Sequence, residues 1–99
     1  MADHQRGIQT VELAGEILKL LSSSYKPLSL SEIAEQMNMV PSSVYKYLVS
    51  MVRIGLLKRD ESTLEFEAGA LCLRLGLSHL NHNQLLKNAR IALTQFAEQ

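Results

Sequence analysis

The stretch LSLSEIAEQMNMVPSSVYKYL, residues 28–48, most constrains the fold, because it contains two short helical patterns separated by a very short turn. Ser29 and Glu32 form the S-x-x-E pattern of a capping box, which predicts a helix that begins directly after Ser29. Asn38 suits the left-handed residue that ends a helix, and Pro41 suits the first turn of the next helix. The stretch therefore predicts two helices joined by a turn of a few residues.

The spacing within this stretch is typical of a helix-turn-helix. Two helices that cross closely need a small residue in the first helix and a turn residue four positions later, which Ala34 and Asn38 supply. Apolar residues flank both positions: Ile33, Met37, Met39, Val44 and Tyr47. The pattern predicts a helix-turn-helix that binds DNA, although winged helices that bind other proteins satisfy the same spacing.

Helical spacing of apolar residues predicts the extent of the other helices in the chain. A first helix is expected over residues 10–21, and Gly55 ends a helix that covers residues 41–54. Helical spacing returns over residues 70–80 and again over residues 84–97. The chain is therefore expected to be mainly helical.

Between these helices the apolar period changes to that of a strand. Leu64, Phe66 and Ala68 alternate with glutamates, which predicts a small hairpin. Helix, helix, short turn, helix and hairpin is the order of a winged helix. We therefore predict a mainly α fold with a small β-hairpin: a winged helix-turn-helix over residues 1–69, followed by linker and dimerisation helices over residues 70–99.

The predicted helix over residues 41–54 has an outward face that suits a major groove. Its apolar side, which includes Tyr47, points to the core on a helical wheel. The outward, border and flanking positions carry hydroxyls and cations: Ser42, Ser43, Tyr45, Lys46, Ser50 and Arg53. Short hydroxyl side chains allow a close approach to base edges, and a helix N-terminus favours phosphate. We predict that this is the recognition helix and that these residues contact DNA.

Lys58 and Arg59 stand at the start of the predicted hairpin, where a wing meets the DNA backbone. Phosphate contact is the functional interpretation, and a solvated charge pair is the alternative. The rest of the hairpin is acidic, so we do not expect its far strand to lie on DNA.

Composition argues against several other functions. Ten basic and ten acidic residues give a formal net charge of zero, so the overall charge does not by itself favour a nucleic-acid partner. The sequence has no apolar run that could span a bilayer and no secretory signal, which predicts a cytoplasmic protein without membrane contact. The spacing of His79 and His82 lacks a third metal ligand nearby, and Cys72 has no disulfide partner. We expect no metal, no cofactor and no catalysis, because nucleophile and phosphate-loop motifs are also missing.

Apolar surface in excess of what one small core can cover predicts a dimer. The first predicted helix is apolar over about half of its wheel, and residues 70–80 and 84–97 add apolar stripes after the hairpin has closed the core. We expect a homodimer whose interface includes six apolar side chains: Leu13, Ile17, Leu73, Leu77, Leu85 and Phe96. Such a pairing sets two recognition helices about 34 Å apart, or a multiple of that distance.

Five stretches in order resemble the N-terminal DNA-binding domain of IclR-type transcriptional regulators: VELAGEILKLL, PLSLSEIAEQMNM, SSVYKYLVSMVRIGLLKRD, FEAGALCLRLG and LLKNARIALTQFAEQ. The resemblance covers nearly the whole chain, and it implies a dimeric regulator that binds a partly palindromic double-stranded DNA operator. It also implies a ligand-binding domain after the linker helix. A small-molecule effector is therefore expected only through a C-terminal domain that this sequence lacks, and we expect the chain to be a fragment of a longer regulator.

Three features depart from the family pattern. Pro41 stands one residue closer to the recognition helix than usual, Asn38 replaces a common glycine, and the hairpin is acidic and lacks its usual glycine. We predict a sequence-specific double-stranded-DNA-binding domain that regulates transcription without catalysis. The alternatives are a winged helix that only docks to proteins, which the zero net charge favours, then an RNA-binding winged helix, and then an enzyme.

Overall fold

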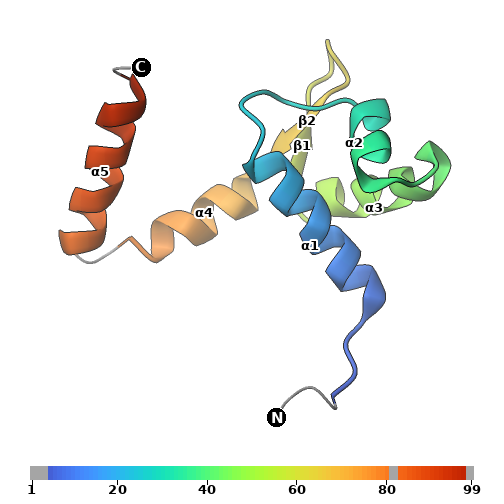
Figure 1. Cartoon of the computed structure of the whole chain (residues 1–99), viewed down its shortest axis with the longest axis horizontal. Coiled ribbons are helices and arrows are strands. Elements are labelled where there is room, and N and C mark those ends of the chain that lie inside the picture. Colours follow the sequence, from blue (N-terminus) through green and yellow to red (C-terminus); the bar gives the residue numbers. More distant parts are fainter. Residues whose placement is uncertain (1–4, 81–82, 98–99) are drawn as a thin grey trace.

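The structure of the chain, a computed structural model, describes residues 5–80 and 83–97, apart from the side chains of residues 83–85 and 96–97. Its elements are α1 (Gln9–Ser22), α2 (Leu30–Met37), α3 (Pro41–Arg53), β1 (Leu57–Arg59), β2 (Phe66–Ala68), α4 (Ala70–Ser78) and α5 (Asn83–Ala97). The helices α1, α2 and α3 form one body with the hairpin, and α4 leads away from this body to α5 (Figure 1). The predicted fold, mainly α with a small β-hairpin, is confirmed.

Local hydrogen bonds define both ends of α2. The Ser29 hydroxyl accepts the N–H of Glu32 at 3.1 Å, and the Glu32 carboxylate accepts the N–H of Ser29 at 2.9 Å, so the predicted capping box is present. Asn38 ends the helix in the left-handed region, at φ 56° and ψ 45°. Pro41 takes the first position of α3. The predicted helix-turn-helix is therefore confirmed.

The core lies where α1, α2, α3 and the hairpin meet. Its buried members are Ile17, Leu28, Ile33, Ala34, Val44, Leu48, Met51, Leu57 and Phe66. Ala34, whose small side chain predicted a close helix crossing, is buried between α2 and α3. Tyr47 packs against this core, as predicted. Ile17 also belongs to it, because α1 packs across α2, α3 and β2 and turns this side chain inward.

The hairpin is tied to the helices through Phe66. β1 and β2 pair antiparallel, with Leu57 opposite Ala68 and Arg59 opposite Phe66. The Leu28 N–H donates to the Phe66 carbonyl at 3.0 Å, and the Phe66 N–H donates to the Leu28 carbonyl at 2.7 Å. Phe66 thus joins the hairpin to the segment that leads into α2 as well as to the core.

The second strand is shorter than the predicted alternation, because β2 covers Phe66–Ala68 and does not include Leu64. Phe66 is buried, but Ala68 is exposed, and Leu64 lies in the turn with 53% of its surface exposed. The cause is the hydrogen bonding of the turn, in which the Leu64 N–H donates to the Asp60 carbonyl at 2.7 Å and the Asp60 N–H donates to the Glu65 carbonyl at 2.8 Å. These bonds hold Leu64 at φ 63°, in the left-handed region that leucine rarely adopts.

We expect Leu64→Gly to be more stable than Leu64→Ala by about 1 kcal/mol. Both substitutions remove the same exposed side chain, but only glycine adopts this backbone conformation without a steric penalty. Urea unfolding of the two variants, followed by circular dichroism, measures the difference. Equal stabilities would show that the turn is not strained at this position.

Two glycines allow α3, β1 and α4 to meet. Gly55 follows α3 at φ 88°, a conformation that favours glycine. Gly69 is buried just before α4, and its N–H donates to the Leu56 carbonyl at 2.9 Å. A Cβ atom at Gly69 would collide with the carbonyl oxygen of Gly55 and would lie 2.8 Å from that of Leu57. The missing side chain therefore lets the start of α4 pack against β1.

α5 lies apart from the core. In Figure 1 it stands beyond α4, away from the body that contains α1, α2 and α3. The radius of gyration is 15.8 Å, whereas a compact domain of this length has about 13 Å. Leu86, Ile91 and Leu93 of α5 are exposed. This helix thus presents an apolar surface that the described part of the chain leaves uncovered.

Candidate nucleic-acid interface

The outward face of α3 carries the polar side chains that were predicted from the sequence to contact DNA. Ser42, Tyr45, Lys46, Ser50 and Arg53 are exposed, and Ser43 is half-buried. On the opposite face, Val44, Leu48 and Met51 are buried in the core. Because both faces belong to one helix, core packing sets the direction in which the polar face points.

The charges on α3 favour a polyanionic partner. The helix contains two cations, Lys46 and Arg53, and no acidic residue. Neither cation forms an ion pair within the described residues, whereas the Nζ atoms of Lys19 and Lys26 lie 3.2 and 3.1 Å from carboxylate oxygens. The unpaired cations of α3 therefore lie on an exposed surface where phosphate groups can approach.

The two cations of the predicted wing, Lys58 and Arg59, are exposed on β1. The guanidinium carbon of Arg59 lies 5.3 Å from the centroid of the Phe66 ring, which is a cation–π contact across the hairpin. Phe66 is itself buried, so the ring is a fixed support. This contact positions Arg59 without neutralising its charge.

The turn of the hairpin carries a stable negative charge. The Asp60 carboxylate accepts hydrogen bonds from the Ser62 hydroxyl at 2.6 Å, the Thr63 N–H at 3.0 Å and the Ser62 N–H at 2.8 Å. These hydrogen bonds lower the pKa of Asp60 to about 2, so the carboxylate stays ionised at neutral pH. Glu61 and Glu65 lie in the same turn. The turn is therefore repelled by phosphates, in contrast to the cations of β1.

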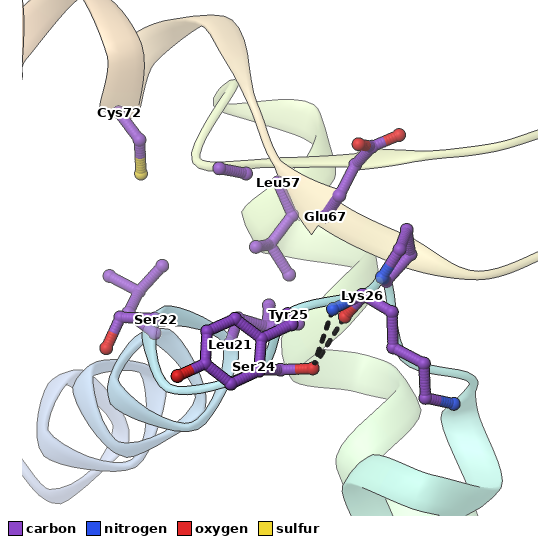
Figure 2. A pocket seen from close by; sticks show the side chains of 11 residues that line it. Leu21, Ser22, Ser24, Tyr25, Lys26, Leu57, Glu67 and Cys72 are labelled. Carbon is purple, nitrogen blue, oxygen red and sulfur yellow. Dashed lines mark hydrogen bonds between the residues drawn. The ribbon is translucent and has the colours of Figure 1, made fainter. Parts of the chain in front are cut away.

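An open groove lies beside α4. Figure 2 shows Leu21 of α1 on one side of it, Leu57 and Glu67 of the hairpin on the other, and Cys72 of α4 at its end. Its volume is about 490 Å³. The Cys72 thiol donates to the Leu56 carbonyl at 3.2 Å, which helps to attach α4 to the body. The first turn of α4 thus contributes Cys72 to this groove.

The predicted dimer contacts differ in their exposure. Leu73 and Leu77 of α4 are 65% and 60% exposed, and Leu13 of α1 is half-buried. Ile17 is 1% exposed and packs in the chain's own core, which corrects its prediction as a surface contact. Two predicted contacts have side chains outside the described residues: Leu85 and Phe96.

The remaining candidate residues form no further site in the part of the chain that the structure describes. His79 is exposed, and His82 lies outside the described residues. Among residues 5–80 and 83–97, no group of three or more histidines, cysteines or carboxylates is placed to hold a metal ion. No helix within the described ranges is long and apolar enough to cross a membrane.

A second groove, which was not predicted from the sequence, lies between α1 and α3. It has a volume of about 430 Å³ and brings Val11 and Ala14 of α1 together with Tyr47 of α3 and with Ile54, which directly follows α3. Lys46 also lines it, so the groove adjoins the polar face of α3. Helical spacing describes each helix alone, and it contains no information that would place these two faces together.

The second helix of this helix-turn-helix has an exposed face and contains no acidic residue, and the hairpin that follows packs on the same core. This arrangement defines a winged-helix DNA-binding domain. The family model described as the IclR helix-turn-helix domain matches residues 10–61. The chain belongs to the IclR family, because this match covers more than half of it, and it is the DNA-binding domain of a transcriptional regulator.

Three similar proteins place the chain within longer relatives. It is 31% identical over 97 residues to the HTH-type transcriptional regulator BhcR of Paracoccus denitrificans, a match that covers 98% of this chain and 34% of the relative. The crystal structure of Pseudomonas aeruginosa HmgR matches with a TM-score of 0.70 and 34% identity, over 84% of this chain and 36% of that one. The crystal structure of Thermotoga maritima IclR matches with a TM-score of 0.67 and 31% identity, over 78% and 31%. The chain thus spans about a third of the length of these proteins.

Proposed function

We propose that this domain binds double-stranded operator DNA with sequence preference, with α3 in the major groove. The observation that carries the proposal is the exposed face of α3, which combines two unpaired cations with short hydroxyl side chains and has no acidic residue. Such a face allows close approach to base edges, and its cations suit phosphates. Membership of the IclR helix-turn-helix family supports the same class of partner.

Different parts of α3 have different roles in this proposal. Ser42, Tyr45 and Lys46 lie in the N-terminal half of the helix, the part of a recognition helix that contacts base edges. Ser50 and Arg53 lie in the C-terminal half, where we assign contacts to the phosphate backbone. The core-facing side of the helix sets the direction of both groups.

The hairpin contributes less. Lys58 and Arg59 are assigned to phosphates, and the contact with Phe66 supports Arg59 in an extended position on β1. The negative charge at Asp60 and its neighbours keeps the turn itself away from the duplex. The wing therefore adds affinity through its first strand alone.

Selection of genomic DNA fragments by the purified chain tests the proposal directly. We expect fragments with a shared sequence to be enriched, and an inverted repeat among them if two copies bind together. Recovery of no preferred sequence would contradict sequence-specific binding and would leave the protein-docking alternative. That alternative has no independent support in the described structure.

We expect Ser42→Ala and Tyr45→Ala to weaken binding to the selected site by about 1–3 kcal/mol and to relax sequence preference, as loss of a base contact does. Lys46→Ala is also expected to weaken DNA binding, because it removes a contact with a base edge or with a phosphate. Arg53→Ala should weaken binding to all DNA sequences equally, and it should reduce the slope of log affinity against log salt concentration by about 1. Fluorescence anisotropy with selected and scrambled duplexes at several salt concentrations measures these effects.

Lys19→Ala is the matched control, because this exposed lysine of α1 is paired with Glu16 and lies outside the proposed interface. It should leave both affinity and sequence preference unchanged. If Ser42→Ala, Tyr45→Ala and Lys46→Ala all bind like the parent, α3 is not the recognition helix.

We also propose that two copies of the chain pair through α4 and through the side of α1 that carries the half-buried Leu13. Leu73 and Leu77 lie one turn apart on the same side of α4 and are largely exposed. Cys72, which directly precedes Leu73 in α4, lines the groove that also includes Leu18 and Leu21 of α1 (Figure 2). Pairing would remove these side chains from water and set two α3 helices about one turn of DNA apart.

Sedimentation equilibrium should reveal a concentration-dependent dimer. Leu73→Ser combined with Leu77→Ser should shift it towards monomer without unfolding the chain, because both side chains are exposed within one copy. Leu75→Ser is the matched control, since Leu75 is 58% exposed but lies on the other side of α4. A parent chain that stays monomeric at high concentration would contradict the proposed pairing.

The remaining assignments follow from this function. We assign DNA binding to residues 1–69 and linkage and dimerisation to residues 70–99, and we place the protein in the cytoplasm, where it has access to DNA. We assign it no catalytic role, in keeping with the regulators that it resembles. Because the chain spans about a third of these relatives, we assign the ligand-binding domain that the family resemblance implies to a part of the regulator outside these 99 residues.

A further inference from the structure

The groove between α1 and α3 has the composition of a small-molecule site. Met51, which is 3% exposed, lies at its base with Ala14 and the half-buried Tyr47. Val11 and Ile54, which are 67% and 60% exposed, lie at its edge. The volume of about 430 Å³ falls within the range of ligand pockets, about 300–1,000 Å³. The groove therefore offers an apolar bed to one small molecule.

The polar groups along this groove determine which ligand it suits. They are the hydroxyls of Thr10 and Ser50 and the ammonium group of Lys46. None of the described residues that line the groove is acidic, and Lys46 has no ion pair within the described part of the chain. A cation beside an apolar bed complements an anion attached to an apolar body. A cationic ligand, in contrast, would be repelled by Lys46.

We propose that this groove binds an aromatic or aliphatic carboxylate, with its apolar part against Tyr47 and Met51 and its carboxylate towards Lys46. Lys46 is also one of the side chains that we assign to DNA, so an occupied groove engages this cation and weakens DNA binding. This second step rests on the proposed function of α3. Ligand binding itself depends only on the groove.

Titration of the ¹⁵N-labelled full chain with 2-naphthoate, followed by NMR, tests the site. The neutral amide 2-naphthamide has nearly the same shape and serves as the control ligand. We expect saturable shifts of the amide signals of Val11, Ala14 and Tyr47, with naphthoate bound about three- to tenfold more tightly than naphthamide, because only naphthoate pairs with Lys46. Equal affinity for both probes, or shifts that do not saturate, would overturn the proposal.

Two variants locate the binding site. Val11→Glu places a carboxylate at the edge of the groove, and it is compatible with folding because Val11 is exposed in the first turn of α1, where acidic residues are favourable. Val11→Glu and Lys46→Gln should each weaken naphthoate binding about three- to tenfold. Lys19→Gln removes a charge elsewhere on α1 and should leave binding unchanged. Unchanged binding in both groove variants would show that naphthoate binds elsewhere.

Fluorescence anisotropy with a selected DNA duplex, at constant ionic strength, tests the coupling to DNA. Naphthoate should raise the apparent Kd for DNA to a plateau, and Val11→Glu should require more naphthoate for the same effect. Unchanged DNA affinity at saturating naphthoate would overturn the coupling. A chain that binds no DNA in the absence of naphthoate would instead refute the proposed function, and the NMR titration would still decide whether the groove is a ligand site.

Discussion

Phe66→Ala is expected to destabilise the domain by about 3–5 kcal/mol, the usual cost of removing a buried aromatic side chain. Phe66 is 2% exposed, and its ring packs in the core below the guanidinium group of Arg59. A loss of this size is a large part of the stability of a small domain, which is about 5–15 kcal/mol. Urea unfolding followed by circular dichroism measures it as a lower midpoint.

Leu64→Ala provides the comparison within the same hairpin. Leu64 is 53% exposed and lies in the turn, so its truncation should change the free energy of unfolding by less than about 1 kcal/mol. If Phe66→Ala and Leu64→Ala have similar effects, the ring of Phe66 is not part of the core, and the hairpin does not pack as described.

Gly69→Ala is expected to destabilise the domain by about 1–3 kcal/mol, the usual cost of overpacking. The added methyl group would meet the backbone carbonyl oxygens of Gly55 and Leu57, which cannot turn aside as a flexible side chain can. The start of α4 would have to move away from β1, and the hydrogen bond from the Gly69 N–H to the Leu56 carbonyl would be strained. Urea unfolding measures the loss of stability.

Gly15→Ala makes the same chemical change in the middle of α1, where no atom lies within 4 Å of the added methyl group. It should stabilise the domain by about 0.5–1 kcal/mol, because alanine favours a helix more than glycine does. The two variants are therefore expected to have opposite signs. A Gly69→Ala variant as stable as the parent would show that the α4 junction has room for a side chain.

The helix-turn-helix could be predicted from sequence because its determinants are local. The capping box of Ser29 and Glu32, the left-handed Asn38 and the first-turn Pro41 each involve residues at most a few positions apart. The prediction failed where distant contacts decide the outcome. Ile17 is buried because α1 packs on elements that follow much later in the chain, and the spacing within α1 does not show how many neighbours cover it.

The same distinction applies to the hairpin and to the candidate site. The alternation around Phe66 was sufficient to predict a strand, but the hydrogen bonds of Asp60 decide where the turn ends, and they remove Leu64 from the strand. The outward residues of α3 were predictable, since the core positions of one helix define its opposite face. The groove that adjoins Lys46 was not predictable, because α1 supplies half of it.

The division of α3 into two faces has a consequence for how such regulators diversify. Val44, Leu48 and Met51 stabilise the domain from one side of a helix of 13 residues, while Ser42 and Lys46 are exposed on the other. Exposed positions accept most substitutions within about 0.5 kcal/mol of folding free energy. If α3 contacts the operator as proposed, mutation can therefore explore new target sequences almost without loss of folded protein. Regulators of this kind can then acquire new target genes while their folding stability stays nearly constant.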